Sequence, residues 1–167
     1  DGFKGINDRQ GHGAGDAALV TVARTLAAAC SADAVVARWG GEEFLVGERG
    51  LDRQRAAEAA ERLRLAISGA TFGGGVGTVT VSIGFAGAPV VPPAGGATAG
   101  AASGHWPDAV ILADRALYAA KRGGRNTWVG LWGRSGAQAA IDDVLEDPSA
   151  AIAGGDVLLS AAHPGFA

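Results

Sequence analysis

Two short apolar runs in the first third of the chain are separated by only four residues. The runs are AVVARW (residues 34–39) and FLVG (residues 44–47), and Gly-Gly-Glu-Glu lies between them. Apolar, β-branched runs joined by so short a polar segment predict a β-hairpin, with the two glycines supplying positive φ angles at the turn. The chain is therefore expected to contain antiparallel sheet, with two adjacent carboxylates at the tip of a hairpin.

Helical and strand patterns alternate along the rest of the chain. Apolar residues recur at helical spacing over residues 14–30, 52–68 and 107–122, which predicts three amphipathic helices. The alternating run TVTVSIGFAG (residues 78–87) predicts a strand, and NTWVGLW (residues 126–132) predicts a closing strand. Residues 1–13 are expected to form a loop with at most a short helical turn, and the low-complexity residues 88–104 are expected to form a loop. This order predicts an α/β (α+β) fold in which helices flank a mainly antiparallel central sheet.

Composition limits the partners of the chain. With 167 residues, 48% of them hydrophobic, it is long enough for one compact core. A formal net charge of -3 gives no overall positive field, so we expect no nucleic acid polymer as a partner. No apolar run is long enough to span a membrane, so this domain is expected to make no membrane contact. The single cysteine, Cys30, excludes an internal disulfide and favours a cytoplasmic location.

The two glutamates between the strands are candidate metal ligands. Adjacent carboxylates repel each other, and a cation held against them offsets that cost. Glu42 and Glu43 therefore suit Mg²⁺, which binds carboxylates together with waters and phosphate oxygens. The alternative is a solvated turn whose acids keep the hairpin soluble. The three histidines, His12, His105 and His163, lack zinc-ligand spacing, and no zinc site is predicted.

Lysine is rare in this chain. Of fourteen basic residues only Lys4 and Lys121 are lysine, so a lysine that departs from the arginine bias indicates a use for a compact ammonium, such as binding phosphate. Lys121 stands near Arg125 in the sequence KRGGR at the end of a predicted helix. Cations at a helix C-terminus also stabilise the helix dipole without any ligand, and this alternative stays open.

A third candidate group flanks a glycine-bearing turn. Asn7 and Asp16 lie on either side of the sequence QGHGAG. A carboxylate can accept two hydrogen bonds from the N1 and N2 edge of guanine, and an amide can donate and accept, so this pair can read a guanine base. Alternatively, Asp16 is only a helix N-cap and Asn7 only a turn former.

In this order, the motifs resemble the GGDEF family of diguanylate cyclases, which condense two GTP molecules into cyclic di-GMP. DGFKGIND (residues 1–8) resembles the D-x-D-x-F-K-x-I-N-D motif, GHGAGD (residues 11–16) resembles G-H-x-x-G-D, and RWGGEEF (residues 38–44) contains the signature in its GGEEF form. VTVSIGFA (residues 79–86) and ADRALYAAKRGGRN (residues 113–126) resemble the strand and helix that follow. The resemblance implies the nucleotidyl-cyclase, or palm-like, fold of that family.

The resemblance also implies roles for individual residues. Glu42 matches the catalytic carboxylate and a metal ligand, and Glu43 matches a second ligand of Mg²⁺ or Mn²⁺. The expected substrate-binding residues read guanine (Asn7 and Asp16) or contact phosphates. The complete set is Gly2, Phe3, Lys4, Asn7, Asp16, Lys121 and Arg125.

The resemblance sets expectations for domains and partners as well. Residues 1–132 are expected to be the GGDEF domain, and residues 133–167 a loosely structured C-terminal tail. Because Asp1 aligns with the second acid of D-x-D, the first strand and the first metal-binding acid are expected upstream of residue 1. GTP is the implied substrate and cyclic di-GMP the product, and catalysis is expected to need a homodimer. Two alternatives remain: a catalytically inactive GGDEF module that binds GTP or cyclic di-GMP as a regulatory domain, and a protein-docking domain without nucleotide.

Overall fold

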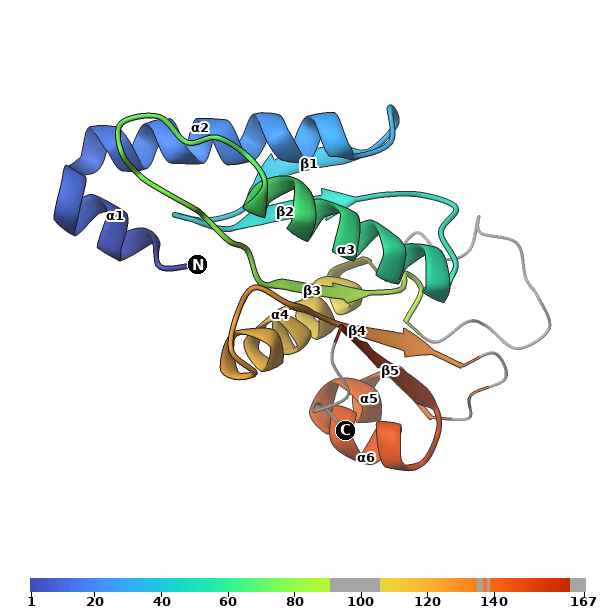
Figure 1. Ribbon diagram of the computed structural model, residues 1–167. Coiled ribbons are helices and arrows are strands. Elements are labelled where there is room, and N and C mark those ends of the chain that lie inside the picture. The colour runs from blue at the N-terminus through green and yellow to red at the C-terminus, as the bar shows by residue number, and fades with distance from the viewer. Residues whose placement is uncertain (91–105, 135–136, 138, 163–167) are drawn as a thin grey trace. The chain divides into compact units, whose positions relative to one another are not determined.

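A computed structural model describes residues 1–90, 106–134, 137 and 139–162 (Figure 1). The chain divides into two compact units, Asp1–Val81 and Ser82–Ala167. Both units combine helices with short strands, so the predicted mixed α/β class is confirmed. The predicted loop at residues 88–104 lies almost entirely outside the described residues.

The first unit contains three helices and a hairpin. In chain order these elements are α1 (Phe3–Gln10), α2 (His12–Ala29), β1 (Val35–Arg38), β2 (Phe44–Gly47) and α3 (Arg53–Ser68). The strands β1 and β2 pair in antiparallel register, with Val35 opposite Gly47 and Arg38 opposite Phe44. The predicted hairpin is therefore confirmed, and α2 runs alongside it (Figure 1).

The helix α1 replaces most of the loop expected over residues 1–13. The sequence of α1 is poor in strong helix formers. Gly2, directly before the helix, has a left-handed φ of 70°, and the side chain of Ile6 within the helix is buried, with 5% of its surface exposed. Packing of that one apolar side chain outweighs the low helix propensity of the neighbouring Gly, Asn and Asp residues.

The core of the first unit forms where α2 and α3 pack together. Helix α3 starts at an N-cap, Asp52, whose carboxylate accepts a hydrogen bond from the Arg55 backbone N–H at 2.8 Å. The buried apolar side chains of the two helices are Ala18, Leu19, Val22, Leu26, Ala59, Ala60, Leu63 and Ile67. Because these residues recur every three or four positions, each helix buries one stripe, as its sequence pattern predicts.

The strand predicted over residues 78–87 is shorter than expected. Only β3 (Ile83–Ala86) is a strand. Further upstream, the Thr80 carbonyl accepts a hydrogen bond from the amino group of Asp1 at 2.7 Å, and the Thr80 hydroxyl donates to the Asp1 carboxylate at 3.0 Å. Alternating apolar and polar residues favour an extended backbone, but a strand also needs hydrogen bonds to a neighbouring strand. In the described part of the chain, the pairing with β4 covers only Ile83–Ala86.

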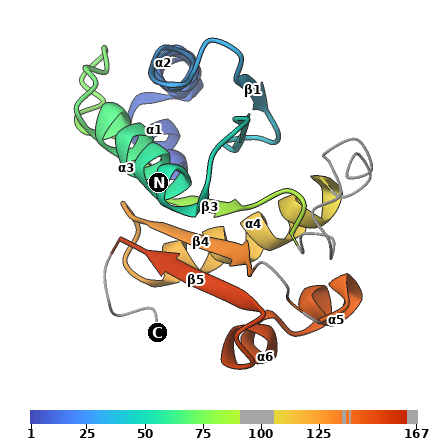
Figure 2. The same ribbon diagram turned by 90° about the vertical axis from the view of Figure 1, so that its right-hand side faces the viewer.

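The second unit is a three-stranded sheet covered by helices. Besides β3 it contains α4 (Trp106–Arg122), β4 (Trp128–Gly133), α5 (Ile141–Glu146), α6 (Pro148–Ala153) and β5 (Val157–Ala161). The strand order is β3-β4-β5, with β3 and β4 parallel and β4 and β5 antiparallel. Figure 2 shows α4 lying along the sheet, and a Cβ at Gly84 would overlap the α4 backbone at Ala113 and Leu117. Glycine at this position therefore permits the close approach of helix and strand.

The described part of the C-terminal segment is ordered, which contradicts the expectation of a loose tail. Val144, Ala151 and Val157, from α5, α6 and β5, are buried in one core with Leu112 and Val129. The sequence of this segment has weak periodicity because both helices are short. They are stabilised by packing, α5 against α4 and α6 against β5. The domain boundary expected after residue 132 stays a prediction.

In the part of the chain that the structure describes, no helix is both long enough and apolar enough to cross a membrane.

Candidate functional site

The GGEE segment forms a turn held by backbone and side-chain hydrogen bonds. We call residues 40–43 the acidic turn. The Trp39 and Gly40 backbone N–H groups both donate to the Glu43 carbonyl, at 2.8 and 3.3 Å. Neither Gly40 nor Gly41 adopts a positive φ angle, so the role expected for these glycines is wrong. The turn is closed instead by these bonds and by Arg38.

Arg38 lies at the end of β1 and folds its side chain over the acidic turn. Its Nε donates to the carbonyls of Gly40 and Gly41, both at 3.2 Å, and its Nη2 donates to the Gly41 carbonyl at 2.6 Å. A guanidinium group is suited to this arrangement because its donors are fixed in one plane.

The acidic turn borders a pocket of about 470 Å³ within the first unit. Five of the predicted site residues line this pocket: Phe3, Asn7, Asp16, Glu42 and Glu43. The full lining is Phe3, Asn7, His12, Asp16, Leu19, Arg38, Gly41, Glu42 and Glu43. The candidate guanine readers and the candidate metal ligands therefore face one shared space, although they come from α1, α2 and the acidic turn.

Asn7 contributes an unsatisfied acceptor to this pocket. Its side-chain Oδ1 is buried and has no hydrogen-bond partner among the described residues. The amide packs over Gly15, where an added Cβ would overlap Oδ1 and lie 3.0 Å from the ring of Phe3. Buried acceptors without a donor are costly, so this amide is a candidate to turn toward a polar ligand in the pocket.

The two glutamates suit a metal that is shared with a ligand. Glu42 is exposed and Glu43 is half-buried, and both line the pocket. Nowhere in the described part of the chain do three His, Cys, Asp or Glu side chains gather closely enough to hold a metal by themselves. Two carboxylates with open positions fit Mg²⁺, which commonly takes one or two protein carboxylates plus waters and phosphate oxygens.

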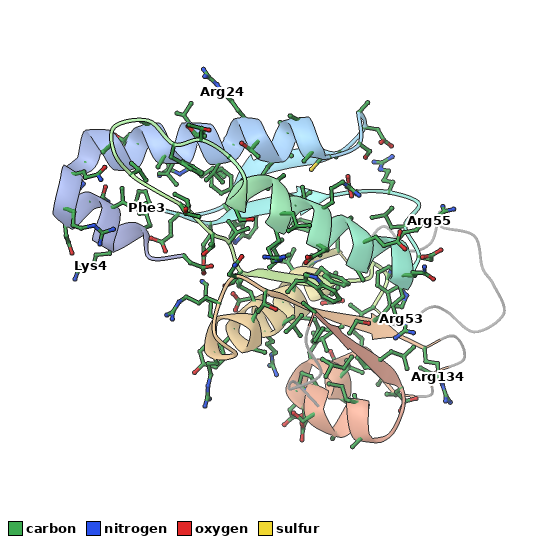
Figure 3. The ribbon with its side chains drawn as sticks, viewed as in Figure 1. Phe3, Lys4, Arg24, Arg53, Arg55 and Arg134 are labelled. Carbon is green, nitrogen blue, oxygen red and sulfur yellow. The ribbon has the colours of Figure 1, made fainter. Side chains whose placement is uncertain are left out.

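The remaining site residues of the first unit lie at the start of α1. Gly2 occupies the N-cap position with φ 70°, and no side chain among the described residues caps that helix end. The side chain of Lys4 is exposed and extends outward from α1 (Figure 3). Helix N-termini present unpaired N–H groups and favour anions, so this end of α1 suits phosphate.

The other two predicted cations belong to the second unit. Lys121 is half-buried in the last turn of α4. Arg125 follows the helix, with a left-handed φ of 63° and a backbone N–H that donates to the Ala120 carbonyl at 3.2 Å. Their part in the candidate site stays a prediction.

The pocket includes residues that the sequence reasoning missed. Arg38 does not stand out by composition, because twelve of the fourteen basic residues are arginine. His12 has no zinc-ligand spacing and Leu19 belongs to an apolar helical stripe, so neither predicts a place in a ligand pocket. Arg38 stands two residues before the first glycine of GGEEF, and this position is the sequence signal that could have identified it.

Comparisons with known proteins agree with this geometry. A sequence model of the family described as "Diguanylate cyclase, GGDEF domain" matches residues 1–127. The response regulator PleD of Caulobacter vibrioides is 39% identical over 135 residues, covering 78% of this chain and 27% of PleD. Diguanylate cyclase DgcM of Escherichia coli is 40% identical over 86 residues, covering 52% of this chain and 21% of DgcM. The chain thus spans about a quarter of the length of these relatives.

Solved structures show the same similarity. The active GGEEF domain of a diguanylate cyclase from Vibrio cholerae matches with a TM-score of 0.62 and 29% identity, over 75% of this chain and 74% of that chain. The GGDEF domain of DgcB from Caulobacter crescentus, in complex with c-di-GMP, matches with a TM-score of 0.61 and 33% identity, over 75% of this chain and 70% of that chain. The chain belongs to the GGDEF domain family of diguanylate cyclases.

Proposed function

We propose that this chain is a diguanylate cyclase domain, which condenses two GTP molecules into cyclic di-GMP and releases pyrophosphate for bacterial second-messenger signalling. The observation that carries the proposal is the shared pocket. It brings Asn7 and Asp16, which can read guanine, to the same space as Glu42 and Glu43 of the acidic turn.

Guanine recognition would use the two polar side chains of α1 and α2. The Asp16 carboxylate accepts hydrogen bonds from guanine N1–H and the N2 amino group, which adenine does not present in that pattern. Asn7 Oδ1, buried without a partner among the described residues, accepts a further hydrogen bond from the base. Phe3 and Leu19 line the pocket with apolar surface suited to a flat base.

Phosphoryl transfer would occur at the acidic turn. Glu42 and Glu43 would hold Mg²⁺ or Mn²⁺ together with phosphate oxygens, and the metal would neutralise charge on the triphosphate. Glu42 would also accept the proton of the attacking 3′-hydroxyl. Lys4, the N-terminal amides of α1 at Gly2 and Phe3, and the cations Lys121 and Arg125 would bind phosphates. Most of the catalysis would then consist of positioning and charge stabilisation.

The reaction would require two copies of the domain. The pocket has one set of guanine-reading residues, so one domain would hold one GTP, and two GTP molecules meet only when two domains face each other. We therefore propose a homodimer, at least during catalysis, located in the cytoplasm, where GTP is available.

The test is product formation by the intact protein. We expect incubation with GTP and Mg²⁺ to yield cyclic di-GMP and pyrophosphate, with a specific activity that rises with protein concentration because two domains must meet. Glu42→Gln should lower kcat by at least about a hundredfold. The matched control is Glu58→Gln on α3, which removes an exposed carboxylate outside the pocket lining and should leave kcat unchanged. Absence of product, even from a protein fused to a dimerising segment, would contradict the proposal.

A regulatory module that binds nucleotide without turnover is the second candidate. It is favoured by the related DgcB domain, which has been solved in complex with c-di-GMP. Thermal unfolding together with a pyrophosphate assay distinguishes the two candidates, because a binding module would gain stability from GTP or cyclic di-GMP but release no pyrophosphate. A docking domain without nucleotide would gain no stability from either.

A further inference from the structure

Arg38 is the cation of the first unit that lines the pocket. Within the part of the chain that the structure describes, its side chain donates three hydrogen bonds, all to the carbonyls of Gly40 and Gly41 and none to the neighbouring carboxylates. The guanidinium group therefore bridges two successive peptide units of the acidic turn. Glu42 follows these peptide units directly, so fixing them also fixes the direction in which its side chain leaves the backbone.

The acidic turn needs such a support. Neither of its glycines has a neighbour that a Cβ would clash with, and at Gly41 nothing lies within 4 Å of the added atom. Two successive glycines lose more backbone entropy on ordering than other residues do, so the turn is intrinsically loose. Two adjacent carboxylates also repel each other, and a guanidinium beside them lowers this cost.

We propose that Arg38 is a positioning residue that orders the acidic turn and thereby presents Glu42 and Glu43 to the metal and the triphosphate. This inference rests on the proposed function, because it names how the metal-binding carboxylates of that same site are held. It adds a role for Arg38 in metal use that is separate from substrate binding.

The geometry requires arginine rather than any cation. Nε and Nη2 reach two different carbonyls from one rigid plane, whereas a lysine ammonium is a single point charge on a flexible chain. A lysine at position 38 would keep the positive charge but lose the bridge. The Arg38→Lys variant therefore separates charge from geometry.

The experiment compares Arg38→Ala, Arg38→Lys and the control Arg24→Ala in the intact protein. Arg24 is exposed and extends from α2 away from the rest of the first unit (Figure 3). The first measurement is amide hydrogen exchange by NMR at Trp39 and Gly40, whose N–H groups bond to the Glu43 carbonyl. The second is cyclic di-GMP formation as a function of Mg²⁺ and GTP concentration.

We expect both Arg38 variants to speed exchange at Trp39 and Gly40 by about tenfold or more, since hydrogen bonds to a charged group are lost. The Mg²⁺ concentration for half-maximal activity should rise by about tenfold and kcat should fall, while KM for GTP at saturating Mg²⁺ changes less than about threefold. Arg24→Ala should match the wild type in every measurement.

Two results would overturn the inference. One is unchanged amide exchange in Arg38→Ala. The other is an Arg38→Lys variant with wild-type exchange and wild-type Mg²⁺ dependence, since charge alone would then suffice. If the wild-type protein makes no product, the proposed function fails, and the exchange measurement alone decides whether Arg38 orders the turn.

Discussion

Replacing Gly15 by alanine tests how the proposed guanine-reading side of the pocket is built. Gly15 is buried in the first turns of α2, and an added Cβ would overlap Asn7 Oδ1, approach Asn7 Cγ to 2.9 Å and lie 3.0 Å from the Phe3 ring. The neighbours cannot both stay in place, so the methyl group must displace the Asn7 amide from the pocket.

The expected magnitude follows from two opposing effects. Alanine in place of glycine favours a helix by about 1 kcal/mol, and overpacking costs about 1–3 kcal/mol, so the unfolding free energy should fall by about 0–2 kcal/mol. Loss of the proposed hydrogen bond between Asn7 and guanine would leave a buried partner unsatisfied, at a cost of about 1–3 kcal/mol. At 1.4 kcal/mol per factor of ten, GTP binding should weaken by about 5- to 150-fold.

The assay is calorimetric titration of GTP and ATP against Gly15→Ala and Gly13→Ala. Gly13 lies in the same helix, and a Cβ there would have no neighbour within 4 Å, so Gly13→Ala should bind GTP as the wild type does. Gly15→Ala should lose most of the preference for GTP over ATP, and urea unfolding should show that it remains folded. A folded Gly15→Ala variant with wild-type GTP affinity and selectivity would refute the reasoning.

Three further predictions concern the structure outside the pocket lining. Asp52→Ala removes the N-cap of α3 and should lower the unfolding free energy by about 1 kcal/mol in urea titration, with no change in GTP affinity. Burial raises the pKa of the Cys30 thiol, and Glu48 raises it further, so Cys30 should alkylate more slowly at pH 8 than a model thiol. Glu48→Gln should lower that pKa and speed alkylation, and an unchanged rate would contradict the assignment. Gly84→Ala places a Cβ against the α4 backbone and should lower the unfolding free energy by about 3 kcal/mol or more, whereas Gly47→Ala, with no neighbour within 4 Å of its Cβ, should not destabilise the protein.

Several elements of the fold were predictable from local pattern. The hairpin of β1 and β2, the helices α2, α3 and α4, and strand β4 lie within one or two residues of their predicted positions. Each has a periodic apolar pattern or a clear start signal, such as Asp52 before α3. Helix α1 and the ordered C-terminal segment were missed because their short sequences carry little periodicity and depend on packing against other elements.

The site was only partly predictable, for a related reason. Residue chemistry and motif resemblance singled out Asn7, Asp16, Glu42 and Glu43, and all four line one pocket. Neither approach selected Arg38, because its bonds to two peptide carbonyls depend on the conformation of the turn.

The amino-acid sequence by itself determined the order of helices and strands, the GGEEF turn between two strands and the types of polar side chain available for chemistry. Those properties are local, because the spacing of apolar residues along a segment determines which face of a helix or strand is buried. Only the tertiary structure decided that α1, α2 and the acidic turn border the same pocket, that Gly15 leaves room for the Asn7 amide, and that Arg38 bridges the turn carbonyls. Such contacts join residues far apart in the chain or depend on backbone geometry, and no periodic pattern encodes them.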